Sequence, residues 1–306
     1  MYTLVAISIV CAVANNIFLH LLSSERRNPN PYLTNAIISA VWVVALLLYN
    51  QGWTDITNVT LVYAFLYGII LTGFIFFKTM AMATGPIALT ALIGCSGFIV
   101  TTTFNSIYWK DPINSFNVAG MILMITAIFM INYTPDSTNA TQEKTSLQWK
   151  IYSALFFAFA VATGIFFRFQ QHFDKPHTDE MMIMSALFTT FVLLGVFIVG
   201  VFKQKRSNNQ TSTHSLAMKT MKEKWKMLGI IVICGLCSCA YNRMNMYNTG
   251  SLPNTIFFPI FNGGVVILSF FSGWLLFKEK PSKLQFIGVS LGVLALIVFS
   301  RFFGIF

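Results

Sequence analysis

The chain has 306 residues, of which 56% are hydrophobic and only 10% are charged, and its mean hydropathy is +0.68. This composition cannot supply the polar shell of a soluble globular protein, so water-soluble enzymes and binding modules are excluded. The net charge is +10, but seven of the twenty basic residues lie between Lys203 and Lys226, and contact with anionic lipid headgroups explains that cluster without nucleic acid.

Apolar runs of the length that crosses a bilayer, roughly 20 residues, recur along the chain and are separated by short polar breaks. A transmembrane barrel would instead show strands of about ten residues with alternating hydrophobicity. The first run has no positively charged start and no cleavage site, so we expect a membrane helix there, not a signal peptide. The ten predicted transmembrane helices are 2–22, 32–50, 59–82, 86–108, 114–133, 150–169, 181–202, 227–247, 252–277 and 282–303.

The sequence repeats itself at an offset of 165 residues. The segment "KTMAMATGPIALT" from Lys78 aligns without a gap with "RMNMYNTGSLPNT" from Arg243, so the two basic residues and the following Thr-Gly pairs coincide. The first predicted helix of each half also matches, with His20 opposite Arg168. The sequence therefore predicts one five-helix repeat over 1–134, a linker over 135–149, and a second five-helix repeat over 150–306.

Five helices per repeat is an odd number, so the second copy must enter the membrane from the opposite side. Inverted repeats of this kind build secondary transporters, in which one half rocks against the other and exposes a central site to each side in turn. The predicted fold class is an all-α integral membrane protein with ten transmembrane helices, arranged as two inverted repeats around a central cavity.

The second half ends with a hairpin of sequence "WLLFKEKPSKLQFIGV" between Trp274 and Val289. With this hairpin and the repeat, the chain resembles the ten-span, EamA-type members of the drug/metabolite transporter superfamily over nearly its whole length. The first hairpin, "YWKDPINSFNVAG", departs from the pattern, with Asp111 where the family often has Glu. The resemblance implies a cavity lined by spans 1 to 4 and 6 to 9, with spans 5 and 10 outside, but it implies no particular substrate.

All the acidic residues are predicted to lie in loops. An ionisable group at mid-membrane costs several kcal/mol and usually marks a pathway or a proton relay. A buried carboxylate that alternately binds a proton and an organic cation is therefore not expected, which argues against cation-for-proton exchange. The ten residues are Glu25, Asp55, Asp111, Asp136, Glu143, Asp174, Asp179, Glu180, Glu223 and Glu279.

Four basic residues, by contrast, fall inside predicted spans: Lys78, Arg243, Arg168 and His20. A basic side chain near a helix end commonly extends to the membrane interface, and we expect this of Arg168; for His20 the interface and the cavity stay open. Lys78 and Arg243 are repeat partners, and no acidic partner is predicted for them, so we predict that they bind a substrate carboxylate or phosphate. Cavity-lining neutral partners are predicted at Asn15, Asn16, Asn242, Asn245 and Asn262, with His20 beside them.

Helix-breaking residues accompany these polar groups. Breaks in membrane helices are tolerated where water or protein satisfies the freed backbone groups, so they support a cavity, although ordinary packing glycines are the alternative. The predicted hinge or break residues are Gly85, Pro86, Gly250, Pro253, Pro259 and Gly263.

No metal site, cofactor or catalytic centre is predicted. Cys234, Cys237 and Cys239 do not converge on one helix face, so we expect small packing residues there. The segment "HFDKPHTDE" (172–180) could hold a metal, but we expect a short solvated loop.

Fourteen Lys and Arg residues lie in the loops after spans 1, 3, 5, 7 and 9, against three on the other face. Basic residues are enriched on the cytoplasmic face, so both termini are predicted to lie on the same, non-cytoplasmic side of a plasma or inner membrane. The family resemblance favours the opposite orientation.

The predicted function is secondary active transport of a small polar metabolite, such as an amino acid or organic acid, by alternating access. Two alternatives stay open. One is the export of organic cations or lipophilic drugs, favoured by the 15% aromatic content. The other is a channel or a non-transporting scaffold. The expected partners are the substrate and the lipid bilayer, with no nucleic acid, and a homodimer stays open.

Overall fold

The computed structural model describes residues 2–24, 30–51, 56–84, 87–111, 114–132, 146–206, 221–276 and 282–302. All regular structure in these ranges is helical. The elements are α1 (Tyr2–Ser24), α2 (Pro31–Tyr49), α3 (Asn58–Thr84), α4 (Ile87–Trp109), α5 (Ser115–Asn132), α6 (Leu147–Phe173), the short 3-10 helix η1 (Lys175–His177), α7 (Thr178–Arg206), α8 (Met221–Ser251), α9 (Asn254–Leu276) and α10 (Lys283–Phe302).

Seven of the described helices are long and apolar enough to cross a membrane: α1, α2, α3, α6, α7, α8 and α9. Helices α5 and α10 contain shorter apolar stretches. The chain is therefore an α-helical, multi-pass integral membrane protein, as its composition predicts.

Three helices start at least three residues earlier than the hydropathy predicts, α6 among them, at Leu147. Helix α7 begins at Thr178 and α8 at Met221, because a hydropathy window ends at the first charges while a helical backbone can continue through them. The prediction that every acidic residue lies in a loop is consequently wrong for Asp179, Glu180 and Glu223. Acidic side chains are favourable in a first helical turn, where they interact with the positive end of the helix dipole.

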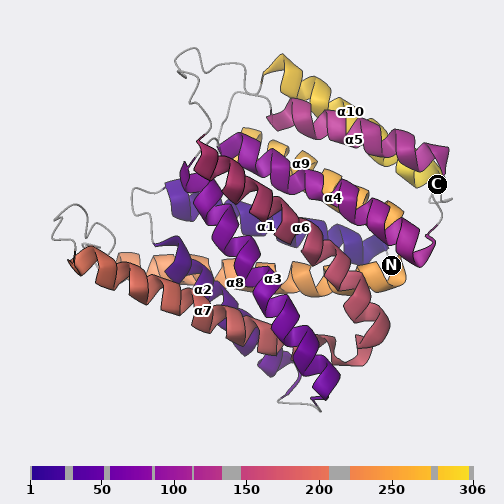
Figure 1. Cartoon of the computed structure of the whole chain (residues 1–306). Helices are drawn as coiled ribbons and strands as arrows, with labels where there is room; N and C mark the ends of the chain where they lie inside the picture. The colour runs from indigo at the N-terminus through magenta and orange to yellow at the C-terminus, as the bar shows by residue number, and fades with distance from the viewer. Residues whose placement is uncertain are drawn as a thin grey trace.

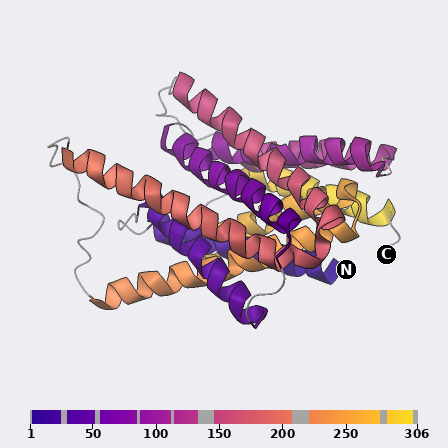
Figure 2. The same ribbon diagram turned by 60° about the horizontal axis from the view of Figure 1, so that its bottom comes forward.

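The helices form a layered bundle (Figure 1). Helices α5 and α10 pack against each other along one edge, and α2 and α7 pack together along the opposite edge. Between these edges, α1 packs on α8 and α9, α6 packs on α3 and α4, and α4 contacts α9. Successive helices run in alternating directions, so α1 begins and α10 ends on the same side of the bundle (Figure 2).

When each helix of α1–α5 is exchanged with its counterpart in α6–α10, most helix–helix contacts map onto contacts that are also present. The contact of α1 with α8 corresponds to that of α6 with α3, and the contact of α1 with α9 corresponds to that of α6 with α4. The pairs α2 with α7, α4 with α9, and α5 with α10 each map onto themselves. Two contacts have no counterpart: α6 packs on α8 and α5 packs on α9, whereas the described residues of α1 and α3, and those of α4 and α10, have no comparable contact.

Two apolar cores hold the bundle together. The larger one joins the end of α1 with α2, α3, α6, α7 and α8, and the smaller one joins the rest of α1 with α4, α5, α9 and α10. At the centre of the larger core, the fully buried Tyr67 ring stacks on Phe166 with ring centres 5.1 Å apart. Cys234 and Cys239 are free thiols buried in the same core, where small side chains let helices approach closely.

Helix α9 runs without interruption through Pro259 and Gly263, so the predicted break at these residues is wrong. Pro259 lies in the second turn, where a proline removes one backbone hydrogen bond without ending the helix. Gly263 lets α9 pack closely on α5, because a Cβ there would overlap the side chain of Met124. The chain does leave helical geometry at Leu252 and Pro253, between α8 and α9. The predicted hinge at Gly85 and Pro86 lies outside the described residues.

Candidate functional site

Lys78 lies in the last third of α3, half-buried and facing the other helices of the bundle. Its ammonium nitrogen is 5.9 Å from the centre of the Phe74 ring, and its charge interacts with the thiols of Cys95 on α4 and Cys234 on α8. No carboxylate forms an ion pair with it in the described part of the chain. Lys78 is thus a basic residue inside the bundle with no anionic partner among the residues that the structure describes.

Asn15 of α1 reaches the same place. Its side-chain oxygen accepts a hydrogen bond from the Cys234 thiol, with 3.0 Å between oxygen and sulfur. Asn15 is 7% exposed. Four helices, α1, α3, α4 and α8, therefore bring Asn15, Lys78, Cys95 and Cys234 together; we call these four residues the central cluster.

Asn16 follows Asn15 in α1 and, unlike it, is exposed. It lies one, two and three helical turns after Ala12, Ile9 and Val5, which are buried where α1 packs on its neighbours. Asn16 continues this inward-facing stripe and yet is exposed.

The other predicted cavity residues contribute less. Asn242 and Asn262 each donate a hydrogen bond to a carbonyl of their own helix, to Ser238 and Phe258, both at 2.9 Å. Asn245 is buried in α8 with its side-chain oxygen unpaired among the described residues. The side chain of His20 lies outside the described part of the structure.

Arg243 does not share the situation of Lys78. Its guanidinium donates two hydrogen bonds to Asp179 in the first turn of α7, at 2.6 and 2.8 Å. The rings of Tyr49 and Tyr247 lie 4.4 and 5.1 Å from the guanidinium carbon. The prediction that Arg243 lacks an acidic partner is therefore wrong, because a bidentate carboxylate neutralises it.

The two repeat-related basic residues also lie at different depths. Lys78 interacts with Cys234, and Arg243 is nine residues further along α8, which corresponds to about 14 Å of helix axis. The positions on α8 that the two basic residues occupy or interact with are thus well separated along the helix. The two repeat partners therefore differ: Arg243 is paired with Asp179, whereas Lys78 has no ion-pair partner among the described residues.

Arg168, near the end of α6, is held by hydrogen bonds to neighbouring segments. Its guanidinium donates to the carbonyl oxygen of Thr249, to that of Leu252 at 3.4 Å, and to Asp111 at 3.4 Å. The second oxygen of Asp111 accepts the backbone N–H of Asn254 at 3.0 Å, at the start of α9. These bonds join the end of α6 to the end of α4 and to the α8–α9 junction.

Both ion pairs lie at the same end of the bundle, the end at which α1 begins. There α4 and α6 end, α7 and α9 begin, and α8 turns into α9. We call this the ion-pair end and define it by Asp111, Arg168, Asp179 and Arg243. Sequence reasoning missed three of these four as functional residues, although Thr178-Asp179-Glu180 carries the signature of a helix start.

The segment 172–180 is not a solvated loop. Asp174, Thr178, Asp179 and Glu180 are all buried. Thr178 accepts hydrogen bonds from the side-chain amides of Gln170 and Gln171, at 3.1 and 2.9 Å. One oxygen of Glu180 is buried without a partner among the described residues, and the carboxylate interacts with Tyr247. The inference that no buried carboxylate is available is therefore wrong.

The ion-pair end also buries uncharged polar groups that have no hydrogen-bond partner among the described residues. They come from the last turns of α4 and the first turn of α9: Thr102, Asn105, Ser106, Asn254 and Thr255. Each such group costs roughly 1–3 kcal/mol when it is buried unpaired. Polar side chains that water could otherwise bind are therefore clustered in the packed interior of this end.

Gly250 permits the close approach of α8 to α6 at the ion-pair end. A Cβ at this position would lie 2.9 Å from Cβ of Gln171, so the helices would have to separate. We expect Gly250→Val to raise the rate at which a maleimide modifies Asn254→Cys by about tenfold, since overpacking costs 1–3 kcal/mol. The control is Gly229→Val in the same helix, where nothing lies within 4 Å of an added Cβ. Equal rates in the two variants would show that Gly250 does not govern closure.

No family model matches the sequence, and no curated protein matches it either. The fold nevertheless occurs among solved structures, of which 29 chains match. One crystal structure of a protein superposes with a TM-score of 0.74 over 98% of this chain and 99% of its own length, at 14% sequence identity. At this identity the similarity defines the fold alone, and it extends over the whole chain.

Proposed function

We propose that the protein is a secondary active transporter that moves a small polar metabolite bearing a carboxylate or a phosphate. The observation that carries this proposal is Lys78, a cation inside the bundle with no carboxylate partner among the described residues. A charge inside a membrane protein is costly unless it is paired, and an anionic substrate would supply the missing partner. Asn15 and Asn16 provide neutral polar groups beside it.

The proposal includes ten transmembrane helices in two inverted repeats, 1–134 and 150–306, of the EamA type in the drug/metabolite transporter superfamily. The exchange symmetry of the packing partners supports it, because a twofold axis in the membrane plane would generate this pattern. The position of α5 and α10 at one edge, away from the central cluster, also supports it (Figure 1).

The ion-pair end is the closed gate of this transporter. The contact of α6 with α8 closes it, and no comparable contact of α1 with α3 is found among the described residues at the opposite end. This asymmetry supports a state that is closed at the ion-pair end and open at the other. In the alternate state α1 and α3 meet, α6 and α8 separate, and the unpaired polar groups of α4 and α9 become hydrated.

The loop charges give the proposed orientation. The basic loops lie at the open end, so this end faces the cytoplasm and the termini lie on the other side. The structure then corresponds to a cytoplasm-open state, with the ion pairs sealing the opposite face of a plasma or inner membrane.

Transport by purified protein in liposomes tests the function. We expect saturable uptake of at least one carboxylate- or phosphate-bearing solute from pooled amino acids, organic acids and nucleotides, with and without a pH gradient. We also expect unlabelled solute on the far side to accelerate it by counter-exchange. Non-saturating flux without counter-exchange would identify a channel and overturn the proposal.

Export of organic cations is the second candidate, and one observation favours it. Glu180 is 5% exposed, has an unpaired carboxylate oxygen, and interacts with Tyr247, so a carboxylate for cation or proton binding exists after all. If this candidate is correct, proton-driven efflux of an organic cation occurs and Glu180→Gln abolishes it. If anion transport is correct, Glu180→Gln leaves Lys78-dependent uptake in place.

A further inference from the structure

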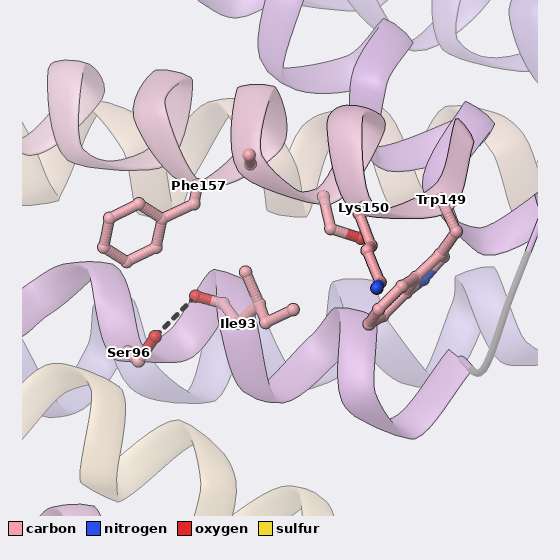
Figure 3. Close-up of a pocket in the computed structure, with 7 residues that line it drawn as sticks. Ile93, Ser96, Trp149, Lys150 and Phe157 are labelled. Atoms are coloured by element: carbon pink, nitrogen blue, oxygen red, sulfur yellow. Dashed lines mark hydrogen bonds between the residues drawn. The ribbon is translucent and has the colours of Figure 1, made fainter. Parts of the chain in front are cut away.

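A recess separate from the central cluster lies between α4 and α6, at the end of the bundle opposite the ion pairs. It is an open groove on the bundle surface with a volume of about 420 Å³, within the range of sites that hold small ligands. Figure 3 shows it with Lys150 and Trp149 at one end and Phe157 at the other. The lining is mostly apolar and consists of Ile93, Ser96, Trp149, Lys150, Ser153, Ala154 and Phe157. We call these residues the α4–α6 slot.

The side chains that α6 contributes to the slot change from charged to polar to apolar along the helix. Lys150, Ser153, Ala154 and Phe157 follow one another at spacings of three, four and seven residues from the lysine, so they share one face of the helix. Lys150 lies in the first turn of α6 and is exposed. Ser153 lies about 4.5 Å and Phe157 about 10 Å further along the axis. Charge, hydroxyl and hydrocarbon thus follow in sequence from the helix start inward.

Only two polar groups of the slot are free to bind a ligand. The Ser96 hydroxyl donates to the carbonyl of Ile93 at 2.8 Å (Figure 3), and the Trp149 indole N–H donates to Thr90 at 3.0 Å. The hydroxyl of Ser153, which is 2% exposed, has no partner among the described residues. The ammonium of Lys150 forms no ion pair within the same part of the chain.

We propose that the α4–α6 slot binds an anionic phospholipid. The lipid phosphate rests on Lys150, an ester carbonyl accepts the hydrogen bond of Ser153, and an acyl chain lies between Ile93 and Phe157. The order of these groups along α6 is that of a phospholipid from headgroup to tail. Lysine and tryptophan at a helix start are typical anchors at the membrane interface, and basic residues there attract anionic lipids. This site lies outside the central cluster and does not depend on transport.

Native mass spectrometry of the full chain, released from detergent micelles, tests the proposal with phosphatidylglycerol and phosphatidylcholine of identical acyl chains. We expect the wild type to retain more phosphatidylglycerol, and Lys150→Gln to reduce that retention about fivefold. Ser153→Ala and Ala154→Phe, which respectively remove the hydroxyl and fill the slot, reduce retention of both lipids. Lys283→Gln, an exposed lysine in the first turn of α10, is the matched control and leaves retention unchanged.

Any of three results would overturn the proposal. The first is equal retention of phosphatidylglycerol and phosphatidylcholine by the wild type. The second is equal retention of phosphatidylglycerol by Lys150→Gln and Lys283→Gln. The third is retention of dodecyl phosphate but not of phosphatidylglycerol, which would show that the slot takes a free amphiphile. Because Ala154→Phe keeps the lysine, its effect separates binding in the slot from attraction to the positive surface as a whole.

Discussion

Replacing Asp179 with asparagine is expected to open the ion-pair end. The substitution keeps the shape of the side chain and removes the charge that binds Arg243. Truncating one partner of a buried, hydrogen-bonded charge pair costs roughly 2–5 kcal/mol, and Arg243 is 26% exposed, so we expect the lower limit. About 2 kcal/mol corresponds to a shift of roughly 30-fold toward the open state. The measurement is the rate of maleimide modification of Asn254→Cys in a background without the five native cysteines.

The matched control for this prediction is Asp174→Asn. Asp174 is also buried at the ion-pair end, but its partner is His177 within the same segment, at 2.8 Å, so its loss should not release α8 from α7. If Asp179→Asn and Asp174→Asn raise the modification rate equally, the Arg243–Asp179 pair is not the lock that we propose.

Removing the charge of Lys78 is expected to reduce substrate transport more than any other single change in the bundle. A hydrogen bond to a charged group contributes about 1.5–3 kcal/mol, so Lys78→Gln should lower the transport efficiency for the anionic substrate by roughly 10- to 100-fold. Lys78→Arg keeps the charge and should retain part of the activity. The measurement is initial uptake rate against substrate concentration in liposomes.

Lys226→Gln is the control for the loss of positive charge, because Lys226 is exposed near the start of α8. We expect it to behave like the wild type. Arg243→Gln should differ from Lys78→Gln, since it releases the gate and leaves the affinity of the central cluster intact. Uptake by Lys78→Gln equal to that by Lys226→Gln would remove Lys78 from the site.

The helices themselves were predictable from the sequence. Each long apolar run needed a helix to satisfy its backbone hydrogen bonds in the membrane, and the predicted runs overlap the described helices throughout. Lys78 stood out for the same reason, because a charge within such a run is costly. The sequence predicted that polar side chains such as Asn15 would lie near Lys78. It did not predict that Cys234 would contribute to the central cluster.

The ion pairs could not be predicted, because they depend on contacts between distant parts of the chain. Arg243 and Asp179 are 64 residues apart, and Arg168 and Asp111 are 57 apart. Asp179 was assigned to a loop because the apolar window began after it, so Arg243 was left without a partner. The repeat was informative about topology but misleading about chemistry: Lys78 and Arg243 occupy related positions, and only Arg243 has acquired a carboxylate.

The most direct measurement is a pair of distances between spin labels in the purified protein, one at each end of the bundle. Phe173→Cys and Ser251→Cys report the separation of α6 and α8 at the ion-pair end, and Ser24→Cys and Ala83→Cys report that of α1 and α3 at the other. When Asp179→Asn is added, we expect the first distance to lengthen and the second to shorten, as two inverted repeats that exchange roles require. Distances that both lengthen, or that both stay unchanged while Asn254→Cys becomes reactive, would contradict alternating access in this protein.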